Sequence, residues 1–218
     1  RYEPNKKSLI LEKELSEGYI LSYLFYENGV IKYNGKAKDG RFEKNIEDET
    51  RFFSHSTGKS ITSYILGHAI CEGYISSIDE IIDWPMMSKT LYQGQRLRDL
   101  LNMSAGDRHI VDKRSTRIKG SRRHHRDMDL ETIASLLEGT KKRGTEVFYN
   151  NFLADVIANY VAFKSGDNYD DLMRSVFQDK VKIKYRISYE KHKKTWDSTS
   201  EYWGDAQTQA SYSYHMTR

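Results

Sequence analysis

Cysteine is almost absent from the sequence, and this absence limits the chemistry open to the protein. Cys71 is the single cysteine, so no internal disulfide and no cluster of cysteine ligands can form. Its neighbours Gly67, Ala69 and Ile70 predict a small buried apolar side chain rather than a reactive thiol. His124 and His125 are adjacent, so they are not expected to converge on one metal ion. We therefore expect no metal site and no cofactor.

Long apolar runs are also missing. No stretch approaches the roughly 18 apolar residues that a membrane-spanning helix needs, so we expect no membrane span. The first residues, Arg1 to Leu11, lack the apolar core of a signal peptide. Because the chain begins without Met, these observations leave the compartment open.

The charge has no strong excess of one sign. The 35 Lys and Arg residues against 31 Asp and Glu residues give a net charge of +4, which by itself does not indicate a nucleic-acid partner. The basic residues concentrate in one run between Lys113 and Arg126, which has no interleaved aromatic residues. Because single-strand binders usually combine such charge with stacking rings, we interpret the run as a solvated loop that favours acidic substrates or anionic surfaces.

The residue pattern predicts an α+β protein with strands near its start and helices in its middle. Two β-rich runs between Tyr19 and Tyr33 flank Asn28-Gly29, a strong hairpin signal. Apolar residues at helical spacing predict several helices, over residues 59–72, 96–103, 130–138, 152–163 and 169–177. After Trp196 aliphatic residues nearly disappear, so this end is expected to be a loop.

Ser56-Thr57-Gly58-Lys59 places an amine three residues after a serine, at the start of a predicted helix. Residues at this spacing share a helix face, so Lys59 can act as the base that activates the Ser56 hydroxyl. The helix N-terminus would supply N–H groups beside a developing oxyanion. Ser188-Tyr-Glu-Lys191 matches the same short pattern, but it lies in a charged run with no apolar helix behind it to desolvate the lysine.

Tyr149-Asn150-Asn151 follows a polar loop and precedes a predicted buried helix. A phenol in this position can face a cleft and relay a proton to a leaving group. Asn151 can hold a substrate carbonyl, or equally well cap the helix that follows. Tyr26-Glu27-Asn28 also fits a Tyr-x-Asn pattern, but the hairpin turn already explains it.

Four ordered blocks carry a family resemblance: Phe53-Ser-His-Ser-Thr-Gly-Lys-Ser-Ile-Thr62, Ala69-Ile-Cys-Glu-Gly73, Leu100-Leu-Asn-Met-Ser-Ala-Gly106 and Phe148-Tyr-Asn-Asn151. In order and spacing they resemble the serine β-lactamase and penicillin-binding-protein-like family, in particular the class C β-lactamases. This group includes related esterases, D-aminopeptidases and 6-aminohexanoate-oligomer hydrolases. The resemblance spans about residues 19–177.

The resemblance implies a β-lactamase/transpeptidase-like fold and an acyl-enzyme mechanism. Ser56 would be acylated by an ester, amide or β-lactam, while Lys59 and Tyr149 exchange its proton and Asn151 binds substrate. The substrate would be a small molecule or short acyl peptide, with no nucleic-acid partner, and the family's usual location favours the periplasm or secretion. No residue implies an oligomeric state.

The chain departs from the family in two places. Gly58 stands where the family often has a larger residue, and the expected Lys-Thr-Gly or His-x-Gly strand does not follow downstream. Lys164-Ser-Gly166 resembles the Lys-Thr-Gly pattern, but we interpret it as the end of the preceding helix. We therefore expect residues 1–218 to form a partial domain that is weakly active or inactive, with strands over 19–53, a helical part over 56–177 and a polar loop region over 178–218.

A non-catalytic function is the alternative. A protein of the same fold that lacks a working site could bind peptides or polyanions through the basic run. Loss of a salt-dependent affinity on neutralising Arg122 and Arg123, with no effect of Ser56→Ala, would favour this function.

Overall fold

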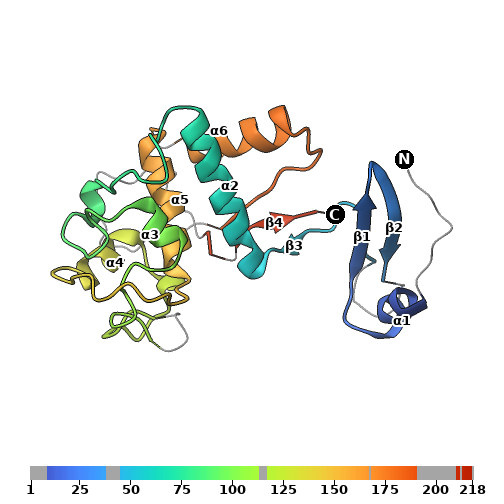
Figure 1. The fold of residues 1–218 in the computed structure, drawn as a ribbon. Helices are drawn as coiled ribbons and strands as arrows, with labels where there is room; N and C mark the ends of the chain where they lie inside the picture. The colour runs from blue at the N-terminus through green and yellow to red at the C-terminus, as the bar shows by residue number, and fades with distance from the viewer. Residues whose placement is uncertain are drawn as a thin grey trace. The chain divides into compact units, whose positions relative to one another are not determined.

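The computed structural model describes residues 9–37, 45–112, 117–166, 168–190, 210–211 and 213–217, without the side chain of Arg126. These residues form an α+β structure of α-helices and two small two-stranded sheets (Figure 1). The chain divides into two compact units, Arg1–Phe52 with Thr217–Arg218, and Phe53–Met216. The α+β class predicted from the sequence is therefore confirmed.

The first unit contains the predicted hairpin. Strands β1 (Ser22–Glu27) and β2 (Val30–Lys36) pair antiparallel, with Glu27 opposite Val30. Asn28 and Gly29 both have positive φ, of 50° and 77°, as a tight two-residue hairpin turn requires. The sequence analysis did not predict helix α1 (Leu9–Glu17), which buries only Leu15 among its residues.

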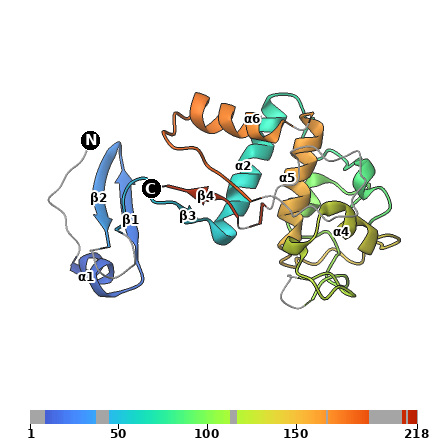
Figure 2. The same ribbon diagram turned by 180° about the vertical axis from the view of Figure 1, so that it is seen from behind.

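Helices α2 (Gly58–Cys71) and α5 (Phe152–Lys164) form the centre of the second unit, where they pack against each other (Figures 1 and 2). Eleven of the 13 residues of α5 are buried, so this helix is the middle of the core. The shorter helices α3 (Leu97–Leu101), α4 (Leu130–Leu136) and α6 (Tyr169–Arg174) surround the pair. All five helices were predicted, with ends that differ by at most three residues, and α6 continues as a π-helical turn over Ser175–Lys180.

The polar stretch near the C-terminal end of the sequence differs from its prediction as a loop. Ala210, Ser211, Ser213 and Tyr214 are fully buried, and strand β4 (His215–Met216) pairs with β3 (Phe52–Phe53). Within the region 178–218, residues 178–180 belong to the π-helical turn and His215–Met216 to β4, while most of residues 181–190 have no regular secondary structure. Small polar residues can be buried when a neighbouring element satisfies their backbone groups.

Two further expectations concern Cys71 and the membrane. Cys71 is exposed at the end of α2, so the prediction that it is buried is wrong. The apolar neighbours Ala69 and Ile70 misled that prediction, because adjacent helical residues point to different faces. Within the described ranges of the chain, every helix is too short or too polar to cross a bilayer.

Candidate active site

Ser56 lies at the entrance to helix α2. It is an exposed residue of a short 3-10 helix, His55–Thr57, that leads directly into the first residue of α2, Gly58. The preceding residue, His55, has φ of 46°, a left-handed conformation that is costly for a residue with a side chain. The backbone therefore turns sharply before Ser56 and presents its hydroxyl at the surface of the second unit.

Close packing explains the glycine at position 58. A Cβ atom on Gly58 would lie 2.6 Å from Ser54 Oγ and 2.9 Å from Tyr214 Cδ2. The Ser54 N–H donates to the Tyr214 carbonyl at 2.7 Å. The start of α2 is thus fixed against the segment before β4, and the glycine permits this close approach rather than loosening the helix.

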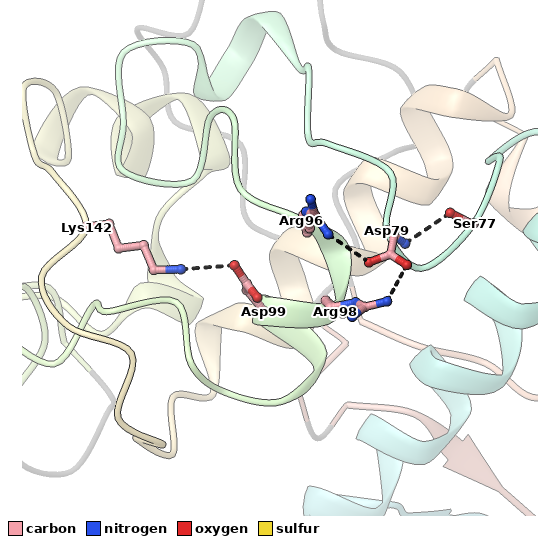
Figure 3. A network of polar contacts seen from close by, with 6 residues as sticks. All are labelled: Ser77, Asp79, Arg96, Arg98, Asp99 and Lys142. Atoms are coloured by element: carbon pink, nitrogen blue, oxygen red, sulfur yellow. Dashed lines mark hydrogen bonds and ion pairs between the residues drawn. The ribbon is translucent and has the colours of Figure 1, made fainter.

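Tyr149 is carried by an extended segment that follows α4, and this segment is anchored to the region around α3. The Lys142 amine pairs with a carboxylate oxygen of Asp99 at 2.9 Å; Figure 3 draws this ion pair. The Arg143 N–H donates to Gly106 O at 3.0 Å, and the Phe148 N–H donates to Met103 O at 2.8 Å. These contacts fix the approach of the chain to Tyr149.

The neighbouring side chains in Figure 3 hold α3 in place. Asp79 accepts hydrogen bonds from both Arg96 and Arg98, and its own N–H donates to Ser77 Oγ. The network therefore joins the segment after α2 to the helix that anchors the Tyr149 segment.

The structure brings Tyr149 to Ser56. The Tyr149 hydroxyl donates to Ser56 Oγ at 2.8 Å, although 93 residues separate the two in sequence. Lys59 Nζ lies 4.9 Å from the centroid of the Tyr149 ring. Burial raises the pKa of the Tyr149 phenol, but hydrogen bonds with Lys59 and Ser56 and the charge of Lys59 together bring this pKa below its usual value. The three residues form one polar cluster.

Lys59 was expected to reach the Ser56 oxygen, but its hydrogen bond goes to another group. Its amine donates to the carbonyl of Ser211 at 2.8 Å, and the described residues show no hydrogen bond between Lys59 and Ser56. Tyr149 is the group of the cluster that touches the serine hydroxyl. In this geometry the phenol donates to the serine oxygen, so Tyr149 can accept the serine proton only in its ionised form.

Of the two roles considered for Asn151, the structure bears only on helix capping. Asn151 is partly exposed and makes no side-chain cap to α5. The cap comes instead from Asn150, whose Oδ1 accepts from the Phe152 N–H at 3.0 Å. Asn150 also donates to Asp107 Oδ2 at 2.6 Å, and this carboxylate accepts from the buried Tyr92 hydroxyl at 3.2 Å. A buried network thus fixes the residue next to Tyr149.

The second matches to the short motifs lie elsewhere. Ser188 pairs with His215 through backbone hydrogen bonds beside β4, and its partner in the motif, Lys191, lies outside the described residues. Tyr26 belongs to the hairpin of the first unit. Ser165 is the C-cap of α5 and Gly166 follows with φ of 69°, so the interpretation of Lys164-Ser-Gly166 as a helix end is confirmed.

A cavity adjoins the cluster. It has a volume of about 310 Å³, and its lining contains Lys59, Thr62 and Ser63 from α2 together with the apolar residues Leu100, Leu101, Met103, Leu153, Ala154 and Ile157. Since Ser56, Lys59 and Ser63 are spaced by three and four residues, they follow one side of α2 and its approach. Lys59 is therefore shared between the cavity lining and the polar cluster with Tyr149.

Three buried residues lie next to Lys59 or its acceptor; Asp155 and Ser211 were not predicted, and His125 belongs to the run that was interpreted as a solvated loop. Asp155 of α5 accepts from the Ser211 N–H at 2.9 Å, and its other oxygen lies 3.4 Å from His125 Nδ1. Asp155 and Ser211 are 0% exposed, and His125 is 2% exposed. An aspartate within an otherwise apolar helical run was a signal for a buried polar site, since unpaired buried carboxylates are costly.

The comparisons give no family assignment. No protein-family model matches the chain, and a search of curated proteins found no match. Within the described residues, no group of three or more His, Cys, Asp or Glu side chains is placed to hold a metal ion.

Proposed function

We propose that this protein is a serine acyl hydrolase that cleaves an ester, amide or β-lactam through an acyl-enzyme on Ser56. The 2.8 Å contact between Tyr149 and Ser56 carries the proposal. A serine hydroxyl needs a base within about 2.6–3.2 Å, and Tyr149 meets this requirement. The resemblance of the four sequence blocks to β-lactamase-related hydrolases agrees with this assignment.

In the proposed reaction the deprotonated Tyr149 accepts the Ser56 proton as Oγ attacks the substrate carbonyl. The positive charge of Lys59 favours the phenolate, because an opposite charge nearby stabilises the ionised form. The tyrosine then returns the proton to the leaving group, and water hydrolyses the acyl-enzyme by the reverse sequence. Tyr149 thus carries the proton in contact with the nucleophile, and the charge of Lys59 stabilises the ionised phenol.

The cavity beside Lys59 suggests where an apolar part of the substrate binds. Six apolar side chains line it, and Lys59 is shared with the reactive cluster. Ligand pockets typically combine such an apolar lining with a few polar groups. We therefore favour substrates with an apolar acyl or leaving group over fully polar ones.

Labelling with a fluorophosphonate probe tests the proposal. We expect the wild-type chain to be labelled and Ser56→Ala to be unlabelled. Ser188→Ala is the matched control, because Ser188 heads the second copy of the Ser-x-x-Lys pattern, and it should be labelled like wild type. Labelling that survives in Ser56→Ala, or that is lost in Ser188→Ala, would contradict the assignment.

The alternative is a non-catalytic protein that binds anionic polymers. The described part of the basic run exposes Arg117, Lys119, Arg122 and Arg123. A heparin or nucleic-acid affinity that falls with salt and is lost in Arg122→Gln/Arg123→Gln would support binding. If the same preparation shows no labelling of Ser56, binding replaces hydrolysis as the proposed function.

A further inference from the structure

Ser211 is held from two sides by elements that are distant in sequence. Its carbonyl accepts the Lys59 amine at 2.8 Å, and its N–H donates to Asp155 Oδ1 at 2.9 Å. The N–H and C=O of one residue are only a few bonds apart, so the position of one constrains the other. Fixing the Ser211 N–H therefore also fixes the acceptor of Lys59.

Asp155 is itself fixed within the core. It is 0% exposed in the middle of α5, and its Oδ2 lies 3.4 Å from Nδ1 of His125, whose ring packs edge-on against Phe152. Burial raises the pKa of the Tyr214 phenol to about 12, and the charge of Asp155 also raises it. A buried carboxylate that accepts a backbone hydrogen bond is a rigid acceptor, because water cannot replace its partner.

The Lys59 amine has a limited choice of positions. It lies beside the Tyr149 ring, and its hydrogen bond to Ser211 directs it there. Lysine has a flexible four-carbon side chain, so without a fixed acceptor the amine would sample other rotamers and move away from the phenol. The position of the Lys59 charge relative to the Tyr149 phenol therefore depends on the Ser211 carbonyl.

We propose that Asp155 is a positioning residue for Lys59: it holds Ser211, and the Ser211 carbonyl in turn holds the Lys59 amine beside Tyr149. Asp155 touches neither Ser56 nor Tyr149 in the described contacts, so its action passes through the Ser211 backbone. This inference rests on the proposed function, because it assigns a further residue to the same site.

The test measures the ionisation of Tyr149 directly and so does not require hydrolysis. The full chain is labelled with ¹³Cζ-tyrosine, the Tyr149 signal is assigned by its loss in Tyr149→Phe, and its shift is followed against pH. In Asp155→Ala we expect the midpoint of Tyr149 to rise toward the ordinary tyrosine value of about 10. In Asp155→Asn, whose side-chain oxygen can still accept from Ser211, the midpoint should stay near that of wild type.

Asp129→Ala is the matched control. Asp129 is also a fully buried aspartate, but it caps α4 by accepting from the Thr132 N–H at 2.7 Å. Its removal should lower stability while the Tyr149 midpoint stays unchanged. An equal rise of the midpoint in Asp129→Ala, or no rise in Asp155→Ala, would overturn the proposal.

Two further measurements separate this inference from the hydrolase proposal. If Ser56 is labelled by a fluorophosphonate, Asp155→Ala should slow the labelling step roughly 10- to 10²-fold with little change in probe affinity. If Ser56 is not labelled while the Tyr149 midpoint still rises in Asp155→Ala, the function fails and the positioning role stands. Should Asp155→Ala not fold, hydrogen exchange of the wild-type chain decides: the Ser211 amide must be protected, and an unprotected amide would overturn the proposal.

Discussion

The hydroxyl of Tyr149 and Oγ of Ser56 are 2.8 Å apart, although 93 residues separate them in the sequence. Ser56 stands in the turn before α2, and Tyr149 stands shortly before α5. Helices α2 and α5 pack against each other, and the residues that precede their N-termini are in contact through the Tyr149–Ser56 hydrogen bond. The contact is a product of helix packing, and it depends on both helices being in place.

Tyr149→Phe tests the proton-accepting role of this phenol. The substitution removes one oxygen from a side chain that is 50% exposed, so stability should hardly change. We expect the rate of fluorophosphonate labelling to fall by about 10²–10⁴, the usual contribution of general acid–base catalysis. Tyr74→Phe, another exposed tyrosine, should label at the wild-type rate; an equal loss in both variants would contradict the role.

The same group predicts the direction of the pH dependence. The phenolate accepts the proton, so the labelling rate should rise with pH as Tyr149 ionises, with a midpoint below the ordinary value of about 10 because its pKa is lowered. Lys59→Met removes the charge that favours the phenolate and should move this rise to higher pH. Measurement of the rate across pH checks both statements, and a rate that falls through this range would contradict them.

Two glycines of α2 should respond oppositely to alanine. Alanine normally stabilises a helix interior relative to glycine by about 1 kcal/mol, and Gly67 has open space around it, so Gly67→Ala should gain roughly 0.5–1 kcal/mol. At Gly58 the added methyl would meet the buried ring of Tyr214 at 2.9 Å, so Gly58→Ala should lose about 1–3 kcal/mol. Urea unfolding of both variants measures the difference, and a stabilised Gly58→Ala would show that this junction is looser than described.

Glu80 predicts a loss of stability in acid. Burial raises the pKa of the Glu80 carboxyl, but hydrogen bonds from the Ser76 N–H, Lys164, Tyr160 and the Ser76 hydroxyl lower it by more. The resulting pKa is about 2. Because the folded pKa lies below the unfolded value of about 4.3, its contribution is present above pH ~4.3 and disappears as the pH falls through about 2.

Glu80→Gln should therefore destabilise the protein by about 1–3 kcal/mol at neutral pH and by much less near pH 2. Denaturant unfolding at the two pH values measures this change. Glu138→Gln is the control: its carboxylate pairs with Lys89 at the surface, where ion pairs contribute little, so it should leave stability nearly unchanged. A Glu80→Gln effect of equal size at both pH values would contradict the ionic origin.

The cavity beside Lys59 predicts a dependence on acyl-chain length. Ser63 is exposed and lines the cavity, so Ser63→Trp should fill its entrance without disturbing the core. We expect kcat/KM for p-nitrophenyl hexanoate to fall about tenfold or more relative to the acetate ester. Ser60→Trp, on an exposed position of the same helix outside the lining, should leave the ratio unchanged. Equal ratios in both variants would place the acyl chain elsewhere.

The sequence was sufficient to predict the elements that are specified by neighbouring residues alone. The Asn28-Gly29 turn, the apolar spacing of α2 and the buried run of α5 each specify their own structure, and all three were predicted. Helix α1 was missed because it buries a single residue and carries little periodic signal. Cys71 was misplaced because burial depends on which face of α2 meets a neighbour, and tertiary packing decides that.

The candidate residues of the site were suggested by motif spacing, but their contacts were not. The motif spacing identified Ser56, Lys59 and Tyr149, and the structure places them together. The backbone carbonyl of Ser211 could not be predicted, since a peptide group is the same in every residue and its role follows only from its place in space. Asn150 took the capping role that was considered for Asn151 because the preceding backbone aims its side chain inward, toward Asp107.

The pairing of β3 with β4, supported by the bond from Ser54 N–H to Tyr214 O, has a topological consequence. Strands β3 and β4, at the two ends of the second unit, are held together by this pairing, so a short peptide could connect them. The unit is then a candidate for circular permutation, with new termini opened in an exposed loop such as that around Gly120, where an added Cβ meets nothing within 4 Å. A permuted molecule that keeps the Tyr149–Ser56 pair would show that the order of its segments along the chain is not essential.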